Sequence, residues 1–228
     1  MFFPRRCPVC HDIVSERGKL ICSGCEGVFR YVKDPYCMKC GKQLSAPEKV
    51  YCSYCEINSI PYEEGRAVFL YDDAMRKSIY RFKYNSRMEY ARFYAYEIFK
   101  KYEGKIKLWN PDVIIPIPLH KSKLRKRGFN QAFLIAKELS NLLNIPVDDK
   151  LLVRTKKTEK QKNLGVLERN DNLKNAFKIR PNRVQYLSAM LIDDIYTTGA
   201  TMINASHVLK VSGISKVYCI SLSIGRDV

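Results

Sequence analysis

The chain has 228 residues, with 40 Lys and Arg against 23 Asp and Glu, and its formal net charge is therefore +17. This length suffices for one full α/β domain with a small appended module, and it excludes two large domains. No apolar run reaches the roughly 18 residues of a membrane span, and the amino terminus lacks the features of a signal peptide, so we expect a cytoplasmic protein. The excess of positive charge indicates a polyanionic partner.

Eight of the nine cysteines lie in the first 55 residues, as four Cys-x-x-Cys pairs that repeat every 15 residues. Two such pairs can complete one tetrahedral metal site, so eight thiolates predict two structural zinc ions. We expect sequential pairing, with interleaved ligation as the alternative. Disulfides are the competing interpretation, which a cytoplasmic location disfavours. The predicted ligand sets are Cys7, Cys10, Cys22 and Cys25, then Cys37, Cys40, Cys52 and Cys55.

The sequence divides into a double zinc ribbon at 1–58, a polar linker at 59–65 and a larger domain at 66–228. Apolar and β-branched runs in the larger domain alternate with helical patterns. This alternation predicts a parallel sheet with covered faces, which binds ligands at the carboxyl ends of its strands. We expect strands at 66–71, 112–118, 150–154, 187–192 and 217–222, and helices within 73–103, 128–144 and 202–212.

The run from Leu191 to Thr201 joins a buried strand to a helix, and it holds two acids followed by a turn rich in hydroxyls. Free N–H groups at the start of a helix favour anions, and Gly199 lets the backbone approach a phosphate closely. Ionised Asp193 and Asp194 only accept hydrogen bonds, so they suit the two adjacent hydroxyls of a ribose. We therefore predict a ribose 5-phosphate site, with the phosphate held by Thr197, Thr198, Gly199, Ala200 and Thr201.

This run resembles the phosphoribosyl pyrophosphate (PRPP) loop of type I phosphoribosyltransferases, in which two acids follow a hydrophobic strand and precede a Thr/Gly-rich turn. The resemblance implies PRPP as the ligand, Mg²⁺ bound with it, and a type I phosphoribosyltransferase-like parallel sheet flanked by helices.

Two basic segments, after the expected strands at 112–118 and 150–154, should reach the same edge of the sheet. Loops at these places in type I phosphoribosyltransferases receive pyrophosphate or close over the site. The resemblance implies these roles for His120, Lys121, Lys123, Arg125, Arg127, Arg154, Gln161 and Arg169. Cations of the same segments are the predicted contacts to single-stranded DNA, namely Lys121, Lys123, Arg125, Lys126, Lys156, Lys157, Lys160 and Lys162.

The element Arg127-Gly128-Phe129-Asn130-Gln131, the stretch from Arg169 to Phe177 and the four cysteine pairs are similar to the ComF family of competence-associated proteins, also written ComFC. The resemblance covers essentially the whole chain. It implies a cytoplasmic protein that supports DNA uptake in natural transformation and handles single strands beside a helicase-like partner.

Three functions stay open at this point. The chain is a DNA-uptake factor with a PRPP site, a metabolic phosphoribosyltransferase acting on an unidentified nitrogen acceptor, or a regulator that senses PRPP. Enzymes that salvage 6-oxopurines usually carry a carboxylate where Thr197 stands, which disfavours that substrate class. No catalytic residue is assigned. The basic excess, the cysteine module and the resemblance favour the first function.

Overall fold

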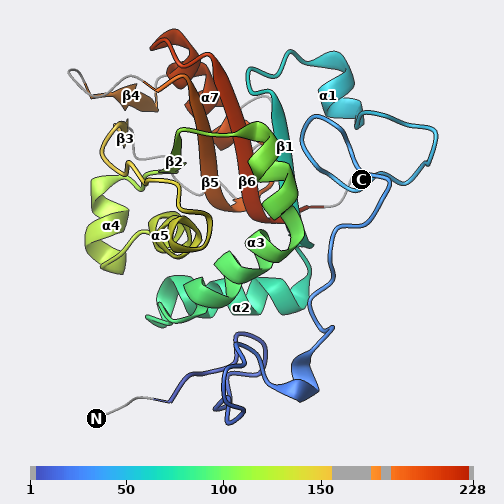
Figure 1. Ribbon diagram of the computed structural model, residues 1–228, viewed down its shortest axis with the longest axis vertical. Coiled ribbons are helices and arrows are strands. Elements are labelled where there is room, and N and C mark those ends of the chain that lie inside the picture. The colour runs from blue at the N-terminus through green and yellow to red at the C-terminus, as the bar shows by residue number, and fades with distance from the viewer. Residues whose placement is uncertain (1–3, 156–175, 181–185, 226–228) are drawn as a thin grey trace.

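A parallel sheet of four strands in the order β1-β6-β5-β2 lies at the centre of the protein (Figure 1). The computed structural model describes residues 4–155, 176–180 and 186–225. The strands of the sheet are β1 (Glu64–Leu70), β2 (Val113–Pro116), β5 (Ser188–Tyr196) and β6 (Lys216–Ile224). Nearly every residue of these strands is buried. The exceptions are the exposed Lys216 and the half-buried residues Glu64, Asp193, Ile195 and Tyr218. Burial on both faces is typical of a parallel sheet, whose strands read as continuous apolar runs.

Helices cover both faces of the sheet. Met190 and Ile192 share a core with α2 (Asp73–Tyr84), α3 (Tyr90–Trp109) and α5 (Gln131–Leu143). Ala189 and Leu191, which point to the opposite face, pack with α7 (Ala200–Val211). A short antiparallel pair, β3 (Leu152–Arg154) and β4 (Phe177–Ile179), adds to this second core.

Local sequence signals set the ends of the helices. The Asp72 side chain caps α2 by accepting a hydrogen bond from Met75 N at 3.1 Å. Asn110 and Asn144 end α3 and α5 in the left-handed conformation, with φ of 45° and 55°. Asparagine tolerates this backbone conformation better than most residues, so each helix stops where the chain must turn back to the sheet.

The amino-terminal module has little regular structure, only the 3-10 turn η1 (Ser23–Cys25) and the short helix α1 (Ser53–Ile57) among its described residues. Its two halves pack on opposite faces of the sheet. Phe29 belongs to the core beneath α2 and α3, whereas Leu44 and Cys52 belong to the core on the α7 side. The module therefore wraps around the edge formed by β1.

The predicted α/β class with an amino-terminal cysteine-rich module is confirmed, but several elements differ from expectation, including two strands of the main sheet. Strand β1 begins at Glu64, inside the expected linker, because Ile60 and Tyr62 are buried and draw this segment into the core. Strand β5 continues through both acids, since its register with β6 extends to Tyr196 and Ile224.

Two further differences lie near the edge of the sheet. The segment expected as a basic loop contains the helix α4 (Lys121–Arg127), which ends at Gly128 with a φ of 82°. The strand expected at 150–154 forms β3, which pairs only with β4 and so stays outside the main sheet. Over the described ranges, no helix has the length and apolar character needed to cross a bilayer.

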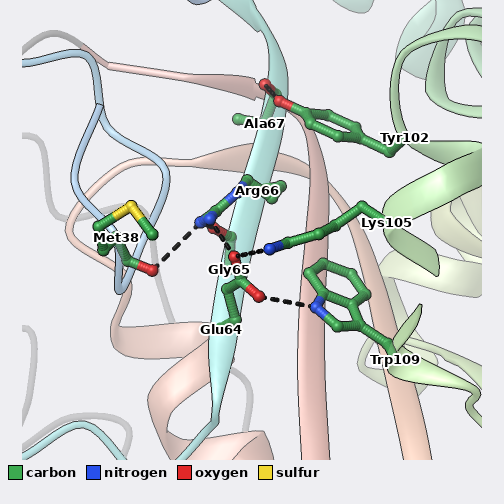
Figure 2. Close-up of polar contacts among 8 residues, drawn as sticks. All are labelled: Met38, Glu64, Gly65, Arg66, Ala67, Tyr102, Lys105 and Trp109. Atoms are coloured by element: carbon green, nitrogen blue, oxygen red, sulfur yellow. Dashed lines mark hydrogen bonds and ion pairs between the residues drawn. The ribbon is translucent and has the colours of Figure 1, made fainter. Parts of the chain in front are cut away.

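A buried arginine joins the cysteine module to the sheet (Figure 2). Arg66 on β1 is 2% exposed, and its guanidinium donates to Met38 O at 3.2 Å and to Gly65 O at 2.7 Å. It also pairs with Glu64, whose carboxylate accepts from Trp109 Nε1 at 2.7 Å and pairs with Lys105 at 2.9 Å. One cluster of charges therefore connects the module, β1 and α3.

Arg66→Ala should lower the free energy of unfolding by about 3 kcal/mol or more, because the network around a buried charge loses its central partner. Urea denaturation measures this change. The matched control is Arg76→Ala, since Arg76 pairs with Asp73 at the surface with side chains 61% and 84% exposed. Its effect should stay below about 1 kcal/mol. Equal losses in the two variants would contradict the role assigned to Arg66.

Candidate functional site

The carboxyl ends of β2 and β5 lie side by side and define one edge of the sheet. Pro116 is in register with Ile192, and Ile117 N donates to Ile192 O at 2.9 Å. The side chain of Asn130 in turn donates to Ile117 O at 3.0 Å. The segment that follows β2 therefore leaves the sheet where the acids of β5 begin.

The two acids of β5 have different surroundings. Asp194 is 8% exposed, and its carboxylate forms an ion pair with Lys83 of α2. Asp193 is half-buried, and its Oδ1 accepts a hydrogen bond from Asp194 N at 2.8 Å. Consecutive residues of a strand point to opposite faces, which explains why only one of the two carboxylates meets the cation from α2.

Ionisation of Asp193 is disfavoured by its surroundings. Burial and the neighbouring charge of Asp194 raise the pKa of Asp193 to about 8, and the attraction of Lys83 only partly offsets this. Burial and the charge of Asp194 therefore favour the protonated form of Asp193 in the folded protein. A ligand that brings positive charge or hydrogen-bond donors to this edge would favour release of that proton.

The turn after the acids places Gly199 at the start of α7. Gly199 has a φ of 80°, and a Cβ at this position would lie 2.1 Å from the Tyr196 hydroxyl. That hydroxyl is 3.0 Å from the hydroxyl of Tyr62, which is fully buried. Glycine is thus required here by the backbone conformation and by the tyrosine folded against it.

The hydroxyl-bearing residues of the turn differ in exposure. Thr197 is exposed, Thr198 and Thr201 are half-buried, and Ala200 is buried in the first turn of α7. The structure therefore brings the acid pair, the glycine turn and the start of a helix together, which is an arrangement suited to an anion with neighbouring hydroxyls.

Lys83 is a member of this site that sequence reasoning missed. It lies in the last turn of α2, and its side chain is only 17% exposed, facing the 11% exposed side chain of Asp194. In the sequence it is one of several cations on an amphipathic helix. No spacing distinguishes it from its neighbours, because only the packing of α2 against β5 selects the residue that meets Asp194.

Helix α2 also contacts the first cysteine pair. Ser78 Oγ donates to Pro8 O at 2.6 Å, and Arg81 donates to Val9 O at 2.7 Å. Pro8 and Val9 are the two residues between Cys7 and Cys10. One helix therefore connects the first half of the cysteine module with the acid pair.

The predicted cations after β2 lie on and around α4. His120 caps this helix, with Nδ1 2.8 Å from Ser122 Oγ. Lys121, Arg125 and Lys126 are exposed, and Lys123 is half-buried. Arg127 donates to Gln131 Oε1 at 2.6 Å and lies over the ring of Tyr84 at 5.0 Å, so it holds α4 against neighbouring helices.

Arg154 is the described cation of the second basic segment. It is the last residue of β3, lies over the ring of Phe177 at 5.4 Å, and is close enough to Asp193 for that charge to act on it. Burial lowers the pKa of Arg154, and Asp193 opposes this shift. The remaining predicted residues of the segment lie outside the described residues, namely Lys156, Lys157, Lys160, Gln161, Lys162 and Arg169.

The cysteines of the module gather in two sets of four sulfurs. Within each set, all sulfurs lie within 4.8 Å of one another, and the sets follow the chain in order, as Cys7, Cys10, Cys22, Cys25 and Cys37, Cys40, Cys52, Cys55. Sulfurs of Cys10 and Cys22 are 3.6 Å apart, and those of Cys40 and Cys52 are 3.7 Å apart. A tetrahedral zinc with bonds of about 2.3 Å needs sulfur separations near this value, whereas a disulfide needs about 2.05 Å. Both sets therefore fit zinc.

Asp193→Asn should change how stability depends on pH. The pKa of Asp193 is about 8 in the folded protein and near its ordinary value of about 3.9 in the unfolded chain. Between these values the folded state binds the extra proton, so this carboxyl makes stability fall as pH rises from about 4 to about 8. Asparagine at position 193 does not titrate, so the urea midpoint of the variant should fall less between about pH 4 and about pH 8.

The control for this measurement is Asp112→Asn. Asp112 accepts hydrogen bonds from Leu187 N and Ser188 N, both at 2.8 Å, at the opposite end of β5. This variant should keep the pH dependence of the unaltered protein. A wild-type dependence in Asp193→Asn would show that this carboxyl is ionised in the folded state.

Known proteins with similar sequences match most of the chain. Residues 1–56 match the family model of the double zinc ribbon domain. Competence protein F of Haemophilus influenzae is 31% identical over 223 residues, which cover 95% of each chain. Competence protein ComFC of Bacillus subtilis is 29% identical over 85% of this chain and 79% of its own length. The DNA utilization protein YhgH of Escherichia coli (strain K12) is 30% identical over 88% of this chain and 89% of its own.

Two solved structures also overlap with this one. A purine phosphoribosyltransferase from Pyrococcus horikoshii matches 61% of this chain and 73% of its own, at 19% identity and a TM-score of 0.32. The adenine phosphoribosyltransferase of Leishmania tarentolae matches 71% and 79%, at 15% identity and a TM-score of 0.34. TM-scores of this size are too low to carry an argument. The sequence relationship, at 31% identity over nearly the full length of both proteins, shows that the chain belongs to the family of competence protein F and ComFC.

Proposed function

We propose that this chain is a cytoplasmic protein of DNA uptake and use that binds PRPP at the carboxyl edge of its sheet and also binds single-stranded DNA. Two relatives are named competence proteins and a third a DNA utilization protein, which supports the biological role. The net charge of +17 supports a polyanionic partner. A helicase-like protein would act beside it, as the family resemblance implies.

The observation that carries the PRPP site is the acid pair followed directly by the glycine turn and the start of α7. Asp193 and Asp194 would accept hydrogen bonds from the ribose hydroxyls. The 5-phosphate would lie at the start of α7, where N–H groups of the turn and the hydroxyls of Thr197, Thr198 and Thr201 are donors. Lys83 would hold the Asp194 carboxylate in place through their ion pair.

The pyrophosphate of PRPP would face the cations that we expect at the same edge. Helix α4, which follows β2, carries Lys121, Lys123 and Arg125. Arg154 approaches Asp193 from β3. Mg²⁺ would accompany the pyrophosphate and neutralise part of its charge. These residues bind and orient the ligand in this proposal, and none of them is assigned a bond-making step.

The two cysteine sets would each hold one structural zinc ion. Four thiolates close the coordination sphere, which is typical of structural rather than catalytic zinc. The first zinc would fix the carbonyls that Ser78 and Arg81 of α2 bind, and the second would fix the turn that Arg66 binds. Zinc would thereby set the position of the module on the sheet.

Asp193→Asn with Asp194→Asn should abolish binding of Mg²⁺ and PRPP, because the amides no longer offer charged acceptors to the ribose hydroxyls. Calorimetry compares the double variant with the unaltered protein, and circular dichroism checks that both are folded. Asp112→Asn, at the other end of β5, is the matched control and should bind normally. Equal affinities for PRPP in the double variant and the unaltered protein would show that PRPP does not bind at this edge.

Elemental analysis should find close to two zinc ions per chain, one for each set of four cysteines. Removing them with a strong chelator should expose residues 4–58 to proteolysis, since zinc bound by four thiolates contributes about 10 to 16 kcal/mol that a module of this size cannot replace. The same protein with its zinc retained, treated with the protease in parallel, is the control. A metal-free preparation with a protease-resistant module would contradict the proposal.

A further inference from the structure

A cavity of about 970 Å³ separates the first half of the cysteine module from the larger domain. One wall runs from Gly18 to Phe29, the second is the outer side of α3, and part of α5 forms the third. We call this cavity the module groove. None of the described residues assigned to PRPP or to the basic segments lines it, so among the residues that the structure describes the groove is separate from the carboxyl edge of the sheet.

The wall formed by α3 presents a cation, an aromatic ring and a second cation in one row. Arg92, Tyr96 and Lys100 are four residues apart, all three are exposed, and all three line the groove. Successive members are about 6 Å apart along the helix axis. Within the part of the chain that the structure describes, neither Arg92 nor Lys100 forms an ion pair, so both charges are available to a ligand.

The floor of the groove is aromatic and holds one buried carboxylate. Phe93 packs against Phe29 with ring centroids 5.9 Å apart. Glu97 is 6% exposed and accepts a hydrogen bond from the Tyr31 hydroxyl at 2.5 Å. A carboxylate can only accept hydrogen bonds, so its remaining capacity favours a ligand with N–H donors at the floor.

The remaining charges of the groove set the orientation of a ligand. Lys19 on the module wall is already paired with Glu26 at 2.9 Å. Negative charge at Glu97 and Glu138 would repel an anion from the interior, whereas Arg92 and Lys100 would attract one at the rim. The preferred ligand is therefore anionic at one end and flat, with N–H donors, at the other.

We propose that the module groove binds a nucleotide unit, with the base against Tyr96 and its phosphates at Arg92 and Lys100. Stacking on an aromatic ring and contact of cations with the backbone are the two elements by which proteins bind single strands. Glu97 would accept from an exocyclic amino group, as carboxylates do from cytosine N4. Thymine has no such group, so cytosine is favoured over thymine. A free nucleotide and a base within a strand share this chemistry.

The experiment compares dCMP with dTMP by calorimetry, and oligo(dC) with oligo(dT) of equal length by fluorescence anisotropy. The unaltered protein should bind each cytosine probe more tightly than its thymine counterpart. Tyr96→Ala should weaken oligonucleotide binding about fivefold to 100-fold, because a stacked base is lost. Arg92→Gln with Lys100→Gln should lower the slope of log affinity against log salt by up to about 1.4.

Glu97→Gln tests the reading of the base. Glutamine retains an acceptor for the Tyr31 hydroxyl but adds a donor, so the preference for cytosine over thymine should shrink. The matched control is Lys77→Gln with Tyr80→Ala, an exposed cation and tyrosine on α2 that do not line the groove. This control should leave both affinity and base preference unchanged.

Several outcomes would overturn the groove as a nucleotide site. One is an unchanged affinity in Tyr96→Ala, and another is an equal loss in the control. A third is a triple variant with alanine at Lys123, Arg125 and Lys126 that loses DNA binding while Tyr96→Ala keeps it. That result would place the single strand at α4, so the groove proposal would fail while the proposed DNA binding would stand. A glutamate-rich peptide that binds as tightly as dCMP with the same dependence on Tyr96 would make the groove a peptide site. Failure of PRPP binding leaves the groove proposal untouched, because the two sites share no residue.

Discussion

The buried guanidinium of Arg66 is the interaction on which the arrangement of the two parts depends. A charge that is 2% exposed must find its partners within the protein, and Arg66 finds them in Glu64, Gly65 O and Met38 O (Figure 2). The backbones also meet closely here, since a Cβ on Gly41 would lie 2.8 Å from the backbone of residues 65 and 66. These contacts therefore join the second cysteine turn, β1 and α3 closely.

Helix α2 extends this constraint to the candidate ligand site. Its Ser78 and Arg81 bind the carbonyls between the first two cysteines, and its Lys83 pairs with Asp194. Helix α2 thus contacts the first half of the module and the acid pair at once. The cysteine module therefore contacts the helix that carries Lys83, and it also forms one wall of the groove along α3.

The charges of the protein are divided by location rather than spread evenly. The edge of the sheet combines a costly pair of neighbouring carboxylates with Lys83 of α2 and Arg154 of β3, which is a balance that a ligand with both hydroxyls and phosphates can use. The module groove has the opposite arrangement, with its carboxylate at the floor and its cations at the rim. The net charge of +17 therefore does not predict by itself which surface meets a polyanion.

The sequence alone determined the α/β class, the cysteine module and the order of acids, glycine turn and helix, because these are encoded in local spacing and periodicity. Tertiary structure decided the rest. Only packing selects Lys83 among the cations of α2, and only the register between β5 and β6 extends the strand through both acids. Part of the segment expected as a linker belongs to β1 and the core, since Tyr62 meets Tyr196 across 134 positions of sequence. Contacts between residues so far apart depend on how whole elements pack, which no local pattern records.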